Sequence, residues 1–137
     1  MAVYSKYGDF TEQLCRGVHN FGSHTFKVAL SNGTPDATHT GLANISELTT
    51  ANGYTAGGIT TTMGISETGG TTTVTSTDVT WTATGSGITF RYAALYNDTA
   101  TSPADALVAY WDNGSSTTVT SGNTITIDFG ATTFTLT

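Results

Sequence analysis

The sequence has few of the residues on which many small proteins depend. Its 137 residues include one cysteine, two prolines and four basic residues. A single cysteine excludes an internal disulfide, and so excludes the disulfide-stapled secreted scaffolds. It also excludes zinc ribbons and iron–sulfur clusters, which need several cysteine ligands. The length suits a single domain, residues 1–137, which buries enough surface to fold without such links.

Positive charge is scarce and scattered. Ten acidic residues against four basic ones give a net charge of −6. Binding to nucleic-acid phosphates requires clustered cations, so we expect no nucleic-acid partner. No apolar run is long enough to cross a membrane, and Met1–Lys6 lacks the apolar core of a signal peptide. We therefore expect no membrane partner and synthesis in a cytoplasm.

Threonine and glycine dominate what is present. The chain contains 32 Thr, 16 Gly and 11 Ser, whereas charged residues make up only 10%, against about 25% in a typical protein. Hydrophobic residues reach 37%, which excludes a disordered chain. Because threonine is β-branched and fits either face of a strand, this composition predicts sheets joined by turns.

One segment, near residues 9–19, predicts a helix. Asp9 and Glu12 have the spacing of a capping box at its start. Apolar residues then recur at helical spacing and make one stripe: Tyr7, Phe10, Leu14 and Val18. This stripe either seals the end of the β domain or docks on a partner surface. We assign residues 1–22 to an N-terminal arm and helix, in which Ala2–Lys6 extends onto a neighbouring copy.

From residue 23 the apolar period changes to two. Alternation of apolar and polar residues predicts about seven or eight short strands with frequent turn signals between them. Asn97–Ala104 is expected to be a polar loop, and Asn113–Ser116 a turn. The predicted fold class is all-β: a β-sandwich or jelly-roll-like domain over residues 23–137 with one short N-terminal α-helix.

The segment 106–112 is apolar on both faces, which a simple two-layer sandwich does not bury. Leu107, Ala109 and Trp111 lie on one face, opposite Val108 and Tyr110. An apolar second face needs a cover, so we expect Val108 and Tyr110 to lie at a subunit interface.

No set of residues predicts catalysis. His19, His24 and His39 lack the spacing of a zinc site, and His19 is expected to stabilise the end of the helix by favouring its dipole. Cys15 is expected to be a small buried or half-buried side chain. The carboxylates fall beside turn residues, where they stabilise turns. We expect no catalytic residue, no metal, no cofactor and no enzymatic activity.

Five segments of the chain resemble a known family. They are Gly17–Ser23 with Phe26–Asn32, Asn52–Gly58, Phe90–Asp98, Leu107–Asp112 and Gly114–Ser116. In this order they are similar to small virion proteins of tailed bacteriophages. The resemblance covers nearly the whole chain, and it implies a structural role on the virion, with no catalytic motif to carry over.

Within that family the resemblance implies a head decoration (cement) protein. Such a protein is made in the bacterial host cytoplasm and binds the outer surface of the head, with the major capsid protein as its partner. It commonly works as a homotrimer, whose three shell contacts act together and strengthen the shell against internal DNA pressure.

Two other functions stay open at this point. A tail or fibre protein would bind a host glycan through an exposed aromatic platform of Tyr96, Tyr110 and Trp111. A small carbohydrate-active hydrolase would place two carboxylates opposite each other in a cleft, with the pKa of at least one of them raised.

Overall fold

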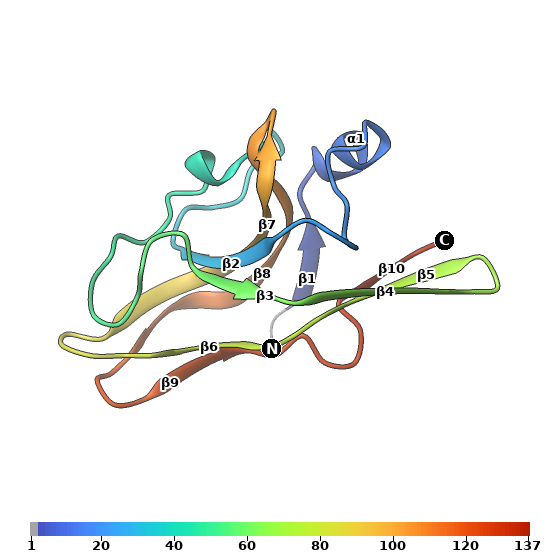
Figure 1. Cartoon of the computed structure of the whole chain (residues 1–137). Coiled ribbons are helices and arrows are strands. Elements are labelled where there is room, and N and C mark those ends of the chain that lie inside the picture. The colour runs from blue at the N-terminus through green and yellow to red at the C-terminus, as the bar shows by residue number, and fades with distance from the viewer. Residues whose placement is uncertain (1–2) are drawn as a thin grey trace.

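The chain folds as an all-β protein with one short helix, which confirms the predicted fold class (Figure 1). The computed structural model describes residues 3–137. The elements in chain order are β1 (Val3–Lys6), α1 (Phe10–Cys15), β2 (Phe26–Ser31), the 3₁₀ helix η1 (Leu42–Asn44), β3 (Ile59–Thr61), β4 (Met63–Thr68), β5 (Thr71–Ser76), β6 (Val79–Thr82), β7 (Ile88–Thr101), β8 (Ala104–Val119), β9 (Thr124–Ile127) and β10 (Phe134–Leu136).

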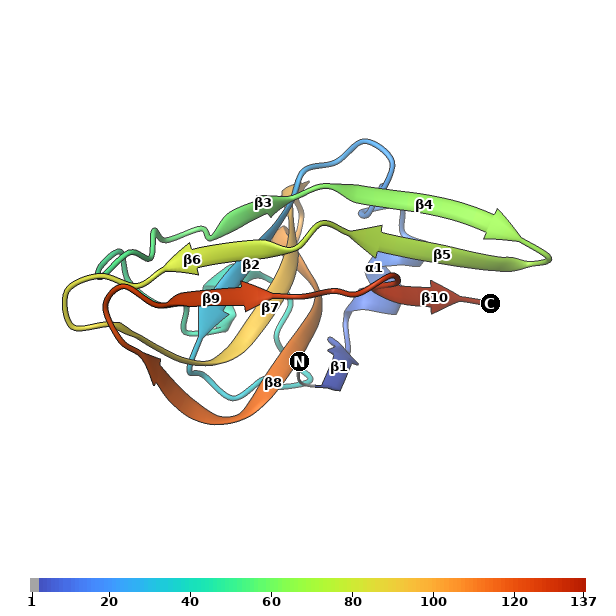
Figure 2. The same cartoon turned by 90° about the horizontal axis from the view of Figure 1, so that it is seen from below.

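Two layers of antiparallel strands form the sandwich. The central sheet has five strands in the order β1-β8-β7-β2-β3. The second layer holds two smaller sheets, β10-β5-β4 and β6-β9. Figure 2 shows the two smaller sheets end to end, with β5 continuing into β6 and β9 leading towards β10, while β3 of the central sheet continues into β4. The β4–β5 hairpin extends beyond the rest of the molecule (Figure 1).

The main core fills the space between the layers. The central sheet contributes alternate residues such as Val28, Leu95 and Trp111, and the second layer contributes Val74, Trp81 and Ile127, all at most 5% exposed. Transfer of such side chains out of water stabilises the fold by roughly 1.5–3 kcal/mol each.

The other face of the central sheet is also covered. A second apolar cluster contains Tyr7, Ala29, Ile45, Ala94, Tyr96 and Leu107. Ile45 follows η1, so the long connection between β2 and β3 supplies the cover. Alanines on β2 and β7 leave room for that connection to lie close to the sheet. The need for a cover over segment 106–112 is therefore met largely within one chain.

Irregular pairing between β7 and β8 decides which side chains face each core. Leu95 pairs with Ala109 and Tyr96 with Leu107, so Val108 is an extra residue on β8, a β-bulge. The bulge turns both Val108 and Ala109 towards the main core, where each is fully buried. The assignment of Val108 to a subunit interface is therefore wrong, because its side chain lies inside the sandwich.

A larger irregularity replaces a predicted turn. Phe90 pairs with Thr117 and Tyr92 with Asp112, so two steps along β7 match five along β8. Asn113–Ser116, predicted as a turn, accommodates this difference within β8 and does not reverse the chain.

The prediction of a loop at Asn97–Ala104 is also wrong, because most of this segment belongs to a strand. β7 continues to Thr101, and only Ser102 and Pro103 separate it from β8.

The N-terminal segment differs from the prediction in two ways. The helix spans only Phe10–Cys15, and Asp9 makes no side-chain cap. Glu12 forms an ion pair with Arg16 at 2.8 Å and does not complete a capping box. Within the predicted arm, β1 pairs with β8 of its own chain, from Val3 opposite Asp112 to Lys6 opposite Ala109. Ala2 lies outside the described residues.

Candidate functional site

The predicted aromatic platform is absent, because two of its three rings are inside the protein. Tyr96 is 1% exposed, and its hydroxyl donates to the carbonyl of Gly57 at 2.6 Å. Trp111 is 5% exposed and packs edge-on against Phe129. Buried rings cannot stack on a sugar, so the platform prediction is wrong for Tyr96 and Trp111.

Tyr110 is the partly exposed member of the set, and it belongs to a tyrosine cluster. Its ring centroid lies 5.0 Å from that of Tyr7 and 6.3 Å from that of Tyr92. Burial, with the neighbouring Tyr110 and Tyr92, raises the pKa of Tyr7 far above its usual value. A hollow of about 180 Å³ lies beside Tyr7 and Tyr110 and is bordered by Lys6 and Asp36. Tyr110 is thus the one residue of the predicted interface that reaches the surface.

The helix stripe seals the sandwich. Tyr7 and Phe10 are buried, and Leu14 and Val18 are partly buried. The Phe10 ring contacts Phe21 and Phe134 edge-on, at centroid distances of 6.1 Å and 5.8 Å. These contacts agree with the core alternative for the stripe.

His19 lies in a buried polar cluster and not at a helix end. The Nδ2 atom of Asn97 lies 3.3 Å from Nδ1 of His19 and 3.0 Å from Nδ1 of His24, and it donates to the carbonyl of Val18. Thr99 donates its N–H to Asn97 Oδ1, which fixes the orientation of the amide. The amide nitrogen has two hydrogens, and with one donated to Val18 the other serves the two Nδ1 atoms; a histidine that accepts it at Nδ1 carries its proton, when neutral, on Nε2. Burial lowers the pKa of His19 to about 4, with His24 as a second cause.

Cys15 is exposed, which corrects the expectation of a buried or half-buried thiol. We predict that an aromatic disulfide reagent modifies Cys15 in the folded protein, at a rate close to that in urea-unfolded protein. The absorbance of the released thiolate measures both rates. A folded rate slower by about a hundredfold or more would place the thiol inside the protein and contradict its exposure.

The carboxylates make no facing pair in a cleft that the structure describes. Burial, with Asp98 as a further cause, raises the pKa of Asp105. Asp98 itself forms an ion pair with Lys27 at 3.0 Å. The aromatic side chain nearby is the buried Tyr96, whose pKa is raised by burial and by Asp98. Within residues 3–137, no group of three or more His, Cys, Asp or Glu side chains is placed to hold a metal ion.

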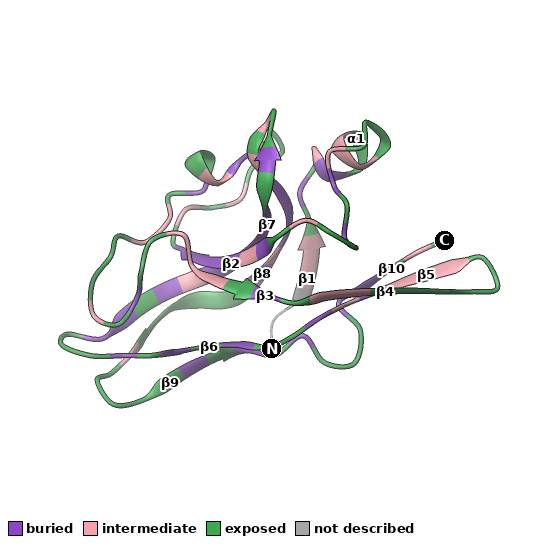
Figure 3. Ribbon diagram, viewed as in Figure 1, coloured by how far each residue is buried: buried purple, intermediate pink, exposed green. Residues whose placement is uncertain are grey.

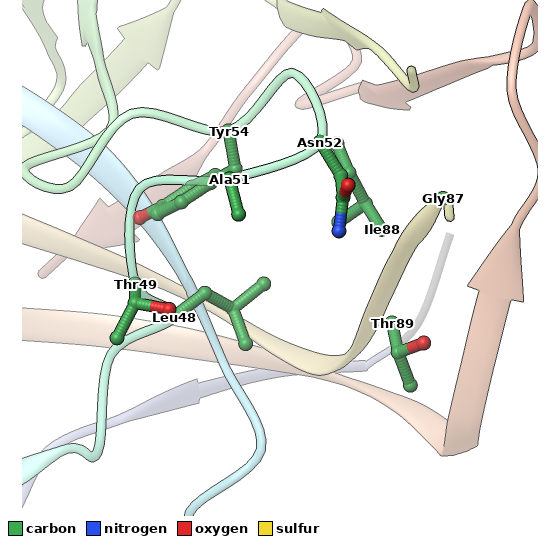
Figure 4. Close-up of a pocket in the computed structure, with 8 residues that line it drawn as sticks. All are labelled: Leu48, Thr49, Ala51, Asn52, Tyr54, Gly87, Ile88 and Thr89. Atoms are coloured by element: carbon green, nitrogen blue, oxygen red, sulfur yellow. The ribbon is translucent and has the colours of Figure 1, made fainter. Parts of the chain in front are cut away.

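A small hollow lies where the loop before β3 meets the start of β7. Its volume is about 200 Å³, and its lining residues are Leu48, Thr49, Ala51, Asn52, Tyr54, Gly87, Ile88 and Thr89 (Figure 4). Leu48 and the Tyr54 ring give it apolar walls, and Asn52 and Thr49 add polar groups. The Tyr54 hydroxyl donates to Glu47 at 2.7 Å and accepts from the N–H of Leu30, so it is occupied in holding the loop. The hollow thus offers apolar walls and neutral polar groups to a small molecule.

A larger groove runs between β1, α1 and β10, and we name it the β10 groove. Its volume is about 530 Å³, and its walls include Tyr4, Lys6, Phe10, Phe134 and Leu136. Tyr4 stacks on Phe134 with centroids 5.7 Å apart, and burial raises the pKa of Tyr4 to about 12. No pattern in the sequence predicts this groove, because residues 4, 10 and 136 meet only in the folded chain.

Comparison with known proteins identifies no relative. No family model, no curated protein and no solved structure matches the chain. Among residues 3–137, no helix is long and apolar enough to cross a membrane.

Surface charge adds one further feature. Three of the four basic residues form ion pairs: Arg16 with Glu12, Lys27 with Asp98, and Arg91 with Asp112. Arg91 binds Asp112 through two hydrogen bonds, which lower the pKa of that carboxyl. Lys6, on the wall of the β10 groove, forms no ion pair within residues 3–137 and is exposed.

Proposed function

We propose that this protein is a structural component of a tailed-bacteriophage virion. It acts as a decoration (cement) protein that binds the outer surface of the head shell as a trimer and stabilises the shell against internal DNA pressure. Its partner is the major capsid protein. The observation that carries the proposal is the resemblance of five ordered segments to small virion proteins.

The placement of those segments supports the proposal. They include β2, residues 90–98 of β7, and residues 107–112 and 114–116 of β8, and these three strands are neighbours in the central sheet. The loop segment Asn52–Gly58 is bound to the same sheet through the hydroxyls of Tyr54 and Tyr96. Segments far apart in the sequence thus form one structural unit, as expected for a shared scaffold.

The character of the surface also supports it. Threonine pairs on outward faces bond to each other, as Thr80 does with Thr126 at 2.9 Å and Thr89 with Thr118 at 2.7 Å. A hydroxyl-rich surface with little charge suits flat, wet contacts with a protein shell. Each such contact is weak, and a trimer makes three of them at once, which multiplies the affinity.

The other two functions have less support. Glycan binding by a tail or fibre protein loses Tyr96 and Trp111 from its platform, because both rings are buried. A carbohydrate-active hydrolase requires a second carboxylate facing Asp105, whereas the neighbouring Asp98 is held by Lys27.

A pelleting experiment tests the proposal. Purified protein is mixed with expanded heads that lack it and, separately, with isolated tails, and the bound copies are counted after sedimentation. We expect saturable binding to heads only, at a copy number that follows the local three-fold positions of the shell.

Heads already saturated with the protein serve as the control, and they should bind no further copies. Binding to tails only, or to neither particle, would contradict the proposal. Heads carrying the protein should also resist rupture by heat or low salt better than bare heads, because the added contacts bridge neighbouring capsomers.

A further inference from the structure

The sheet β10-β5-β4 has two open edges. β4 pairs only with β5 on one side, and β10 pairs only with β5 on the other. An open edge presents unpaired N–H and C=O groups and invites another strand, unless a lysine, a proline or a bulge blocks it. β4 has six residues, Met63–Thr68, with none of these blocking features. Figure 2 shows β4 and β10 at opposite sides of this sheet.

The open edge of β4 carries apolar surface that its own chain does not cover. Ile65 is 55% exposed, and it is the one large hydrophobic side chain this exposed in the described part of the chain. It pairs with Val74, which in turn pairs with Phe134, so the three side chains share one face of the sheet. Glu67 lies two residues further along β4 and therefore on that same face. Much of the projecting hairpin is exposed (Figure 3).

The β10 groove has the complementary character. The side chains of Phe134 and Leu136 lie on the face that carries Ile65 and Glu67, because Leu136 pairs with Thr72 and Thr72 with Glu67. Tyr4 and Phe10 give the groove apolar walls, and Lys6 gives it a cation without an ion-pair partner among residues 3–137. A strand added at the open edge of β10 would present its inward side chains to this groove.

We propose that the occupant of the β10 groove is β4 of a second copy of this chain. The open edge of β4 joins the open edge of β10 in the neighbouring copy, Ile65 covers Leu136 and Phe134, and Glu67 pairs with Lys6. Each copy offers one edge and receives the other, so the interface is head to tail, and the proposed assembly is a ring that closes at three copies. The choice of a second copy rests on this charge and apolar complementarity. It rests on the proposed function only for the number of copies, three.

Charge reversal tests the pairing in the free protein. We measure mass against concentration by sedimentation velocity and light scattering, with a reductant present because Cys15 is exposed. The wild type should reach three times the 14.2 kDa mass of one chain and dissociate on dilution. K6E and E67K should each raise the midpoint concentration of dissociation by about tenfold or more, because like charges then meet in the interface. The double variant K6E/E67K should restore the trimer.

Two further variants separate assembly from folding. T73K places a lysine on the central strand β5, on the opposite face of the sheet and away from both open edges, so it should leave the mass unchanged. I65T keeps a β-branched residue on β4 and removes apolar surface, so it should weaken assembly. Circular dichroism and thermal melting should show that each variant is folded at the concentrations used.

A wild type that stays monomeric at every concentration would overturn the inference, as would a closed dimer. So would single charge reversals that leave the mass unchanged, or a double variant that fails to recover. Binding to heads is measured separately. The mass measurements therefore test only the proposed interface, and the pelleting assay tests only the proposed function.

Discussion

Substitution of Gly58 by alanine is expected to lower the melting temperature by about 10 °C or more, or to prevent folding. Gly58 has a φ of +73°, in the left-handed region that favours glycine. A Cβ atom at this position would lie 1.8 Å from the carbonyl oxygen of Val28 and 2.9 Å from Cα of Ala29. Both contacts are with backbone, so no side chain can turn aside to relieve them.

Neither partner in this contact can move easily. Val28 pairs with Leu95 on one side and with Ile59 on the other, and both Val28 and Ala29 are fully buried. The loop would have to lift from the sheet, which breaks the bond from the Tyr96 hydroxyl to Gly57 and the bond from the Gly57 N–H to Glu47. Loss of several such contacts at a buried site costs about 3–5 kcal/mol.

Gly17→Ala is the matched control. Gly17 has nearly the same φ, +77°, but its added Cβ would meet nothing within 4 Å. Only the left-handed backbone then opposes alanine, at about 1–2 kcal/mol. Urea denaturation of both variants gives the two free energies of unfolding. Equal losses in the two variants would show that Gly58 does not approach β2 as closely as the structure places it.

Local patterns predicted most strands but not where they join. Apolar and polar residues alternate along β2, β6 and β9, as the period of two predicts for strands. Turn chemistry misled at Asn113–Ser116, because polar residues and glycine suit a bulge as well as a reversal. The loop prediction at Asn97 failed because that side chain is fully buried and satisfied by partners distant in the sequence.

Sites that depend on how the strands are arranged in space could not be predicted from the sequence. The apolar second face of segment 106–112 was correctly recognised, but the cover comes largely from Ile45 and Tyr7 of the same chain. Periodicity could not show that a bulge turns Val108 inward. Nor could it show that β4 lies at a sheet edge, where Ile65 is exposed.

The stability of the fold is expected to fall as the pH falls from 6.5 to 4, and His19 is the cause. His19 is 6% exposed and lies among the rings of Phe10, Phe21 and Phe26. Burial is the larger cause that lowers its pKa from 6.5 to about 4, and the nearby His24 adds to it, while Asp9 acts in the opposite direction. Its Nε2 and Asp9 Oδ2 are both buried without a hydrogen-bond partner in the described part of the chain.

The direction of this change in stability with pH follows from proton binding. Between pH 6.5 and 4 the unfolded chain binds a proton at His19 that the folded chain does not bind, so acid favours the unfolded state. The free energy of unfolding should therefore fall by up to about 3 kcal/mol across this window, as one proton coupled to a pKa difference of this size requires. Asp36 and Asp112, whose pKa values are lowered by their hydrogen bonds, lose their contribution only at lower pH. The raised pKa of Asp105 acts in the opposite direction near pH 4.

His19→Asn isolates the effect of the histidine. An asparagine oxygen can accept from Asn97 as Nδ1 does, but it does not titrate, so the variant should lose most of the pH dependence between 6.5 and 4 while the transitions of the carboxyls stay. Urea denaturation at a series of pH values measures both proteins, and the difference between the two curves is the contribution of His19. Parallel curves would mean that His19 titrates alike in the folded and unfolded chains, and that the cluster around Asn97 is open to water.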